Sequence, residues 1–341
     1  MIKIGVIGYG YWGPNLVRNI VESEHTQVAG VCDLNVKRLK VVNARYPGIP
    51  TTTDAQELIQ SAEVDAIVVA TPVASHFCLA LAALKAGKHV LVEKPLAAAS
   101  AEALQLIEEA ARTKRILMVD HTFVYTSAVR KIREVVLNGE LGQPYYYDSV
   151  RINLGLFQHD VNVIWDLAVH DLSILQYVLP GDPVAVSATG ISHVAGETQN
   201  IAYLTLLFRD NLIAHIHVNW LAPVKIRRTL IGGSRRMLIY DDVEGSEKIK
   251  IYDRGIHITD SPESAYQLRI NYRAGDMWAP RLDNTEALKV EMQEFVEAVS
   301  AGRKPLTDGE SGLKVVRILE AATESMARRG QVVELAKGAT Q

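Results

Sequence analysis

Hydrophobic residues form short runs in the first third of the chain. Five runs rich in Val, Ile and Ala, which we expect to be strands, lie at residues 2–7, 27–32, 65–70, 89–92 and 116–119. The segments between them carry apolar residues at helical spacing. Unbroken apolar runs are typical of strands buried on both faces, as in parallel sheets built from βαβ units. The pattern predicts a doubly wound α/β domain.

The pattern changes after about residue 140, where strands follow one another with little helix between them. Turns such as Arg209-Asp210-Asn211 and Gly232-Gly233-Ser234 favour hairpins, so neighbouring strands should be antiparallel. The expected strands are 145–153, 184–192, 201–208, 212–220, 227–231 and 236–240, and the expected helices are 162–179, 285–300 and 309–328. This order predicts an α+β domain with a mostly antiparallel open sheet.

Length and composition agree with two folded domains. Single cores rarely grow beyond ~250 residues, and the chain has 341, so we divide it into a first domain at 1–122 and a second at 123–341. Hydrophobic residues make up 48% and charged residues 22%, which is typical of globular proteins. The net charge of −3, without a basic cluster, argues against nucleic acid as a partner.

The sequence also bears on location and on metal binding. Residues 1–6 have no basic start followed by an apolar stretch, and no apolar run reaches the ~18 residues of a membrane span, so we expect a cytoplasmic protein with no membrane partner. Cys32 and Cys78 are too few for a disulfide framework, and we expect both to be buried free thiols. No His, Cys and carboxylate cluster has metal-ligand spacing, so no metal is expected.

A glycine-rich turn follows the first strand directly. Its residues are Gly8, Tyr9, Gly10, Tyr11, Trp12 and Gly13, which fit G-x-G-x-x-G at the start of a helix. In this pattern the first glycine permits a tight turn, the second lets the backbone approach a pyrophosphate, and the third lets helix and strand pack closely. The motif in this position predicts a Rossmann dinucleotide site formed by these six residues, with the helix N-terminus facing the anion.

Asp33 lies at the end of the second strand, about twenty residues after Gly13. A carboxylate there can accept hydrogen bonds from ribose hydroxyls and would repel a 2′-phosphate, so NAD is favoured over NADP. Lys37 and Arg38 could accommodate that phosphate, which leaves NADP open. As an alternative or additional role, Asp33 could cap the helix that begins near Val36.

Polar residues follow several strands of the first domain. They are Thr71-Pro72, Glu93-Lys94-Pro95 and Asp120-His121. Ligands of an open parallel sheet bind outside the carboxyl ends of its strands, so these groups should share one rim with the glycine loop. Lys94 beside a nicotinamide could polarise a substrate oxygen, although a solvated lysine at a strand end is an equally simple interpretation.

The second domain offers Asp166 and His170 on the helix expected at 162–179. Residues four apart share a helix face, so Asp166 can orient the His170 ring. A histidine held in this way is suited to act as general base for a hydroxyl. Taken alone, such a pair is more often a surface pair.

Four motifs spread along the chain resemble those of the glucose-fructose oxidoreductase, inositol dehydrogenase and rhizopine catabolism protein family, Gfo/Idh/MocA. They are the glycine loop, Ala70-Thr71-Pro72 followed by His76, Glu93-Lys94-Pro95, and Asp166 with His170. The resemblance covers essentially the whole chain. It implies an NAD(P)-dependent oxidoreductase that transfers hydride between nicotinamide and a secondary alcohol or ketone of a sugar.

The resemblance implies roles for individual residues. His170 is the acid/base, Asp166 supports it, and Lys94 contacts the nicotinamide ribose and the reacting hydroxyl. Beside the glycine loop and Asp33, the residues that line the cofactor are Arg38, Thr71, Pro72, His76 and Glu93. Family members commonly assemble through the antiparallel sheet, which implies a homodimer or homotetramer.

Residues 160–166 and the sequence Gly-Tyr-Trp-Gly at 10–13 look most like the branch that acts on nucleotide-linked sugars, including UDP-N-acetylglucosamine 3-dehydrogenases. This implies reaction at a sugar C3, with His121, Arg151, Asn162 and Trp165 as substrate-binding candidates. Trp165 could instead pack, and Arg151 could be a solvated charge on a strand. Free sugars, inositols and aminoglycosides are the alternative substrates.

Two other classes of function compete with this interpretation. A cofactor-sensing regulator would keep the dinucleotide site without catalysis, although both Lys94 and His170 are present here. An NAD-dependent glycoside hydrolase would oxidise C3 only transiently and recycle its cofactor, so net NADH formation distinguishes it from a dehydrogenase.

Overall fold

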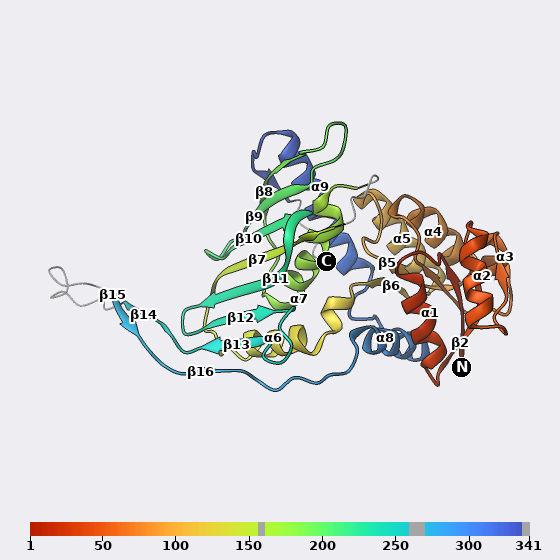
Figure 1. Ribbon diagram of the computed structural model, residues 1–341, viewed down its shortest axis with the longest axis horizontal. Coiled ribbons are helices and arrows are strands. Elements are labelled where there is room, and N and C mark those ends of the chain that lie inside the picture. Colours follow the sequence, from red (N-terminus) through yellow and green to blue (C-terminus); the bar gives the residue numbers. More distant parts are fainter. Residues whose placement is uncertain (156–160, 259–269, 336–341) are drawn as a thin grey trace. The chain divides into compact units, whose positions relative to one another are not determined.

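The computed structural model describes residues 1–155, 161–258 and 270–335 (Figure 1). The chain divides into two compact units, which are described separately below. Unit 1 comprises residues 1–125 and 285–317, and unit 2 comprises residues 126–284 and 318–341. Residues 285–317 therefore group with unit 1, whereas the division made from the sequence placed them in the second domain.

Unit 1 contains a six-stranded parallel sheet with the order β3-β2-β1-β4-β5-β6. Its strands are β1 (Ile2–Ile7), β2 (Thr26–Cys32), β3 (Thr51–Thr52), β4 (Ala66–Val69), β5 (His89–Glu93) and β6 (Leu117–Asp120). Every residue of β4 is fully buried, as the unbroken apolar run predicts. The strand order reverses between β1 and β4, and a ligand crevice is expected at such a switch point.

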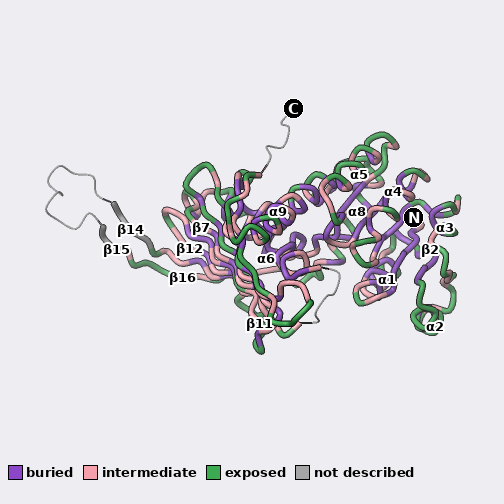
Figure 2. Tube along the Cα trace, turned by 90° about the horizontal axis from the view of Figure 1, so that it is seen from above, coloured by how far each residue is buried: buried purple, intermediate pink, exposed green. Residues whose placement is uncertain are grey.

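The helices of unit 1 alternate with its strands. They are α1 (Gly13–Glu22), α2 (Val36–Arg45), α3 (Ala55–Gln60), α4 (His76–Lys85) and α5 (Ser100–Thr113), joined later by α8 (Ala287–Ala301). Figure 2 shows α2 as largely exposed, and only Leu39 and Val42 of this helix are buried. The predicted doubly wound α/β architecture is confirmed.

Unit 2 is organised around a nine-stranded sheet with the order β16-β13-β12-β11-β7-β10-β9-β8-β17. Among these described strands, β7 and β10 pair in parallel and the other neighbours are antiparallel. The strands are β7 (Pro144–Leu154), β8 (Ala185–Ile191), β9 (Ile201–Leu207), β10 (Ile213–Asn219), β11 (Leu221–Gly233), β12 (Met237–Asp241), β13 (Ile249–Tyr252), β16 (Met277–Trp278) and β17 (Val333–Glu334). The prediction of a mostly antiparallel sheet is confirmed.

The helices of unit 2 include α6 (Ser127–Leu137) and α7 (Val169–Val178), and α9 (Gly309–Ala327) contributes its second half. A π-helical turn at Ile164–Ala168 leads directly into α7. Two further strands, β14 (Gly255–Ile258) and β15 (Ile270–Arg273), form a separate antiparallel ribbon (Figure 1).

One face of the large sheet is buried and the other is open. Along β9 and β10 buried residues alternate with residues of the open face. The open face presents Tyr203 at 43% exposure, Leu207 at 36% and Ile213 at 45%, and the Tyr203 ring stacks on His217 with centroids 4.4 Å apart. An apolar face of this kind is costly in water unless another surface covers it.

Two further findings concern the expectations about cysteines and membranes. Cys32 is buried, but Cys78 is exposed, so the expectation of two buried thiols is wrong for Cys78. Cys78 lies on α4, at a position of that helix that faces solvent. Within the described ranges, none of the helices combines the length and apolar character needed to cross a bilayer.

Candidate dinucleotide and catalytic sites

The three glycines of the loop between β1 and α1 differ in how much space surrounds them. Gly8 has φ +102°, and a Cβ there would lie 2.3 Å from the Ala70 carbonyl oxygen. A Cβ on Gly13 would lie 2.4 Å from the Gly8 carbonyl oxygen. At Gly10, by contrast, a Cβ would meet no protein atom closer than the Arg38 guanidinium at 3.8 Å. The fold itself requires Gly8 and Gly13, whereas the open space at Gly10 fits the close approach of a pyrophosphate.

Asp33 organises the start of this loop. Its Oδ2 accepts a hydrogen bond from the Tyr9 N–H at 2.7 Å, and its Oδ1 accepts one from the Asn35 N–H at 2.7 Å. The Arg38 Nη1 lies 3.3 Å from Oδ2. The N-cap of α2 is Asn35, whose Oδ1 accepts from the Lys37 N–H, so the alternative that Asp33 caps this helix is wrong. Asp33 is thus a fixed carboxylate at the end of β2.

The aromatic residues of the loop have different environments. Tyr9 is 4% exposed and Tyr11 is 89% exposed, so of the two tyrosines Tyr11 presents its ring to solvent. Trp12 is partly exposed, and its indole Nε1 donates to Asp120 Oδ2 at 2.8 Å. The end of the loop is therefore fastened to the end of β6.

His76 connects two other loops of the same rim. It is 1% exposed, with Nδ1 2.8 Å from the Pro95 carbonyl oxygen and Nε2 2.8 Å from the Thr71 carbonyl oxygen. Both ring nitrogens of His76 thus contact a backbone carbonyl oxygen. His76 fixes the loops after β4 and β5 relative to each other, and its predicted contact with the cofactor remains a prediction.

The loops after β5 and β6 carry the remaining candidates of unit 1. Glu93 and Lys94 are partly exposed, and Asp120 is 2% exposed. His121 is also 2% exposed, and burial together with the nearby Lys94 ammonium lowers the pKa of His121 to about 3. His121 is therefore neutral near pH 7, and its predicted contact with substrate remains a prediction.

In unit 2, Asn162 and Trp165 make structural hydrogen bonds at the start of the helical segment. Asn162 Oδ1 accepts from the N–H groups of Ile164 at 3.0 Å and Trp165 at 3.3 Å, which is the role of a helix cap. The Trp165 indole Nε1 donates to Thr323 Oγ1 at 3.0 Å. Asp160, part of the stretch that carried the resemblance to the nucleotide-sugar branch, lies outside the described residues.

Asp166 lies within the π-helical turn, and His170 is the second residue of α7. Hydrogen bonds of a π-turn span five residues, so this turn is wider than the regular helix assumed from the sequence. The orientation of the His170 ring by Asp166 remains a prediction. Asp166 Oδ2 accepts from the Trp220 indole Nε1 at 3.0 Å. Sequence reasoning missed Trp220, which is 1% exposed, and the only signal was a tryptophan at the end of an expected strand.

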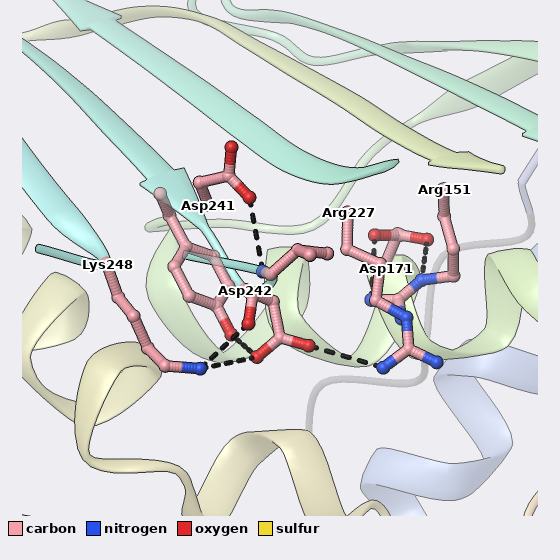
Figure 3. Close-up of polar contacts among 8 residues, drawn as sticks. Arg151, Asp171, Arg227, Asp241, Asp242 and Lys248 are labelled. Carbon is pink, nitrogen blue, oxygen red and sulfur yellow. Dashed lines mark hydrogen bonds and ion pairs between the residues drawn. The ribbon is translucent and has the colours of Figure 1, made fainter. Parts of the chain in front are cut away.

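Arg151 lies in a buried ion pair rather than in solvent (Figure 3). Its Nε donates to Asp171 Oδ2 at 2.7 Å and its Nη2 to Asp171 Oδ1 at 3.2 Å, while Ser149 Oγ also donates to Oδ1. The Arg151 and Asp171 side chains are both 3% exposed, so the alternative of a solvated charge is wrong. Because Asp171 follows His170, the pair anchors the first turn of α7 to β7.

These features of unit 1 define an NAD-binding enzyme of the oxidoreductase class. Residues 2–121 match the family model described as oxidoreductase family, NAD-binding Rossmann fold. Residues 129–239 match the model of the GFO/IDH/MocA C-terminal domain. The chain belongs to the Gfo/Idh/MocA family of NAD-dependent oxidoreductases, as its motifs predicted.

Individual relatives cover nearly the whole chain. A UDP-N-acetylglucosamine 3-dehydrogenase from Acidithiobacillus ferrooxidans is 27% identical over 92% of this chain and 94% of its own. Its solved structure superposes with a TM-score of 0.78 at 26% identity, over 96% of this chain and 98% of that one. A myo-inositol 2-dehydrogenase from Thermotoga maritima is 24% identical over 97% and 98% of the two chains. A levoglucosan dehydrogenase solved with NADH and L-sorbose has a TM-score of 0.82 at 17% identity, over 99% of both chains, which shows a shared fold.

Proposed function

We propose that the protein transfers hydride between NAD and C3 of a nucleotide-linked sugar. The observation that carries the proposal is a dinucleotide loop with free space at Gly10, Lys94 on the same rim and His170 on a separately anchored helix. The similarity to a UDP-N-acetylglucosamine 3-dehydrogenase supports the choice of substrate.

In the proposed mechanism, the chain handles the proton and the charge. NAD, when bound, supplies the hydride acceptor or donor. Neutral His170 removes the proton of the reacting hydroxyl, and the Lys94 ammonium stabilises the developing negative charge on that oxygen. Asp166 supports the His170 ring, and the reverse reaction uses the same groups. His121, Arg151, Asn162 and Trp165 are the candidates for contacts with substrate.

The substrate can be tested directly. We expect purified protein to form one NADH for each sugar oxidised when it is given NAD and UDP-N-acetylglucosamine. Myo-inositol, free sugars and aminoglycosides are the comparison substrates, because inositol 2-dehydrogenases are also among the relatives. If only polyols without a linked nucleotide reacted, the substrate would be an inositol or a related polyol and not a nucleotide sugar. Cleavage of the sugar without net NADH formation would indicate a hydrolase.

The proposal includes a homodimer or homotetramer formed through the open face of the large sheet. Tyr203, Leu207 and Ile213 on that face are exposed in the single chain. We expect Tyr203→Glu to reduce the molar mass in light scattering, because it puts a charge into a covered apolar surface. The control is Val41→Glu on the exposed helix α2, which should leave the mass unchanged. A monomeric wild-type protein would contradict this part of the proposal.

A further inference from the structure

Two buried carboxyl groups meet beneath the dinucleotide loop within unit 1. Glu291 on α8 is 0% exposed and Asp120 at the end of β6 is 2% exposed, and the two side chains interact. Asp120 accepts hydrogen bonds from the Trp12 indole on one oxygen and from the Thr122 hydroxyl on the other. Neither binding of the dinucleotide by the glycine loop nor placement of Lys94 after β5 requires a second buried carboxyl group next to Asp120.

The described residues around Glu291 do little to stabilise a negative charge on its side chain. Neither carboxyl oxygen of Glu291 accepts a hydrogen bond from the described residues. The Thr122 hydroxyl also lies beside Glu291, but its single proton goes to Asp120. Two adjacent buried carboxylates cannot both ionise, and the donors around Asp120 favour its ionised form. The proton of the pair therefore belongs on Glu291.

The electrostatic surroundings of Glu291 agree with this assignment. Burial, followed by the nearby Asp120 carboxylate, raises the pKa of Glu291 well above its usual value. The other titratable groups that face it are Glu93 on β5 and Tyr125 after β6. On α1, which packs against α8, the charged Arg18 is bound by Glu286.

We propose that Glu291 is a positioning residue of the NAD site: as a neutral acid it donates a hydrogen bond to the Asp120 carboxylate, and Asp120 in turn fixes the Trp12 indole at the end of the glycine loop. The loop is then held at both ends by carboxylates, because Asp33 binds the Tyr9 N–H at its start. A loop that is ordered before NAD arrives loses less conformational entropy on binding. Glu291 acts through Asp120 and Trp12 and need not touch the cofactor.

The test compares three single variants by NAD titration, together with a double variant that combines Glu291→Leu and Trp12→Phe. Glu291→Gln keeps a neutral donor toward Asp120 and should bind NAD within about twofold of wild type, since the donated hydrogen bond is retained. Glu291→Leu and Trp12→Phe should each weaken NAD binding about tenfold, the size of a hydrogen bond to a charged group. The double variant should be no weaker than either single variant, because both remove the same chain of contacts.

A matched control separates positioning from packing. Phe295 is 0% exposed on the same helix, and Phe295→Leu should lower the melting temperature while leaving NAD affinity unchanged. Additive losses in the double variant, or a Glu291→Leu protein that binds NAD like wild type, would overturn the proposal.

The proton itself can be observed on proteins that keep their fold. The infrared difference between wild type and Glu291→Gln at neutral pH should contain the C=O stretch of a protonated carboxylic acid. NAD affinity of the wild type should weaken as pH rises toward the raised pKa of Glu291, while that of Glu291→Gln should not follow this change. An absent carboxylic acid band, or identical pH courses for the two proteins, would overturn the assigned proton.

Discussion

The glycine loop and the helical segment that carries His170 are built on different principles. In the loop the essential features belong to the backbone, since Gly8 and Gly13 leave no room for a Cβ and Gly10 leaves space for a ligand. In the segment at 162–171 the essential features are side chains, and several of them already have partners: Asn162 caps the helix, and Trp220 binds Asp166. A site formed by the backbone can be recognised from a sequence motif, whereas a site formed by side chains depends on which partners the folded structure supplies.

The physical reason for this difference is the cost of burial. Burying a polar side chain without a hydrogen bond costs free energy. A polar side chain between a helix and a sheet therefore usually pairs with a complementary group nearby. Arg151 and Asp171 illustrate this outcome.

His170→Ala should lower kcat by about 10²- to 10⁴-fold, because the reacting hydroxyl loses its proton acceptor. NAD affinity should stay unchanged, since the cofactor loop is untouched. The measurements are NADH formation at saturating substrate and NAD titration. His25→Ala, on an exposed loop, is the matched control and should keep its turnover. Full turnover by His170→Ala would remove this residue from the mechanism.

Arg151→Met should lower the free energy of unfolding by about 3–5 kcal/mol, because Asp171 would remain as an unpaired buried charge. Urea unfolding measures the loss. The control is Arg228→Met, whose ion pair with Asp241 is more exposed and contributes about 0–1 kcal/mol. A raised KM at unchanged stability would instead make substrate binding the main role of Arg151.

Gly8→Ala and Gly10→Ala should separate folding from cofactor binding. Gly8→Ala should lower the melting temperature, because it combines a strained positive φ with a clash against the Ala70 carbonyl. Gly10→Ala should melt like wild type and bind NAD at least about tenfold more weakly, since the methyl group occupies the space for the pyrophosphate. Calorimetry and NAD titration measure the two effects. If Gly10→Ala bound NAD normally, the open space at Gly10 would have no role in cofactor binding.

Glu291 is also expected to make the stability of the protein depend on pH. The pKa of Glu291 is raised in the folded protein, so between its usual value of 4.5 and the raised value only the folded state holds the proton. The free energy of unfolding of wild type therefore falls as pH rises through this range. The side chain introduced by Glu291→Gln does not titrate. As pH rises, the free energy of unfolding of Glu291→Gln minus that of wild type should therefore increase by up to about 1.4 kcal/mol per pH unit.

Urea unfolding from about pH 5 to about pH 8 measures this difference, a range in which most proteins are near maximal stability. Glu297→Gln, on the exposed side of the same helix, should run parallel to wild type. A constant difference between Glu291→Gln and wild type across this range would show that Glu291 does not hold a proton in the folded state.

Much of the fold could be predicted because its signals are local. The apolar runs gave five strands of the parallel sheet but missed β3, and the pattern after residue 140 gave β7 to β10 and β12 within one residue at each end. β11 was expected at 227–231 but begins at Leu221. The π-helical turn at Ile164–Ala168 could not be predicted, since no composition signal marks it. It replaces the hydrogen bonds of a regular helix by bonds that span five residues, a detail that the spacing of Asp166 and His170 does not reveal.

The sequence alone determined the parallel sheet of unit 1 apart from β3, the glycine loop and the family, because periodicity and glycine placement act over a few neighbouring residues. Only the tertiary structure decided the partners of the polar side chains. Arg151 meets Asp171 20 positions away, Asp166 meets Trp220 54 positions away, and Trp12 meets Asp120 108 positions away. No local pattern encodes such pairs, because they form only when separate elements pack and their buried polar groups must be satisfied.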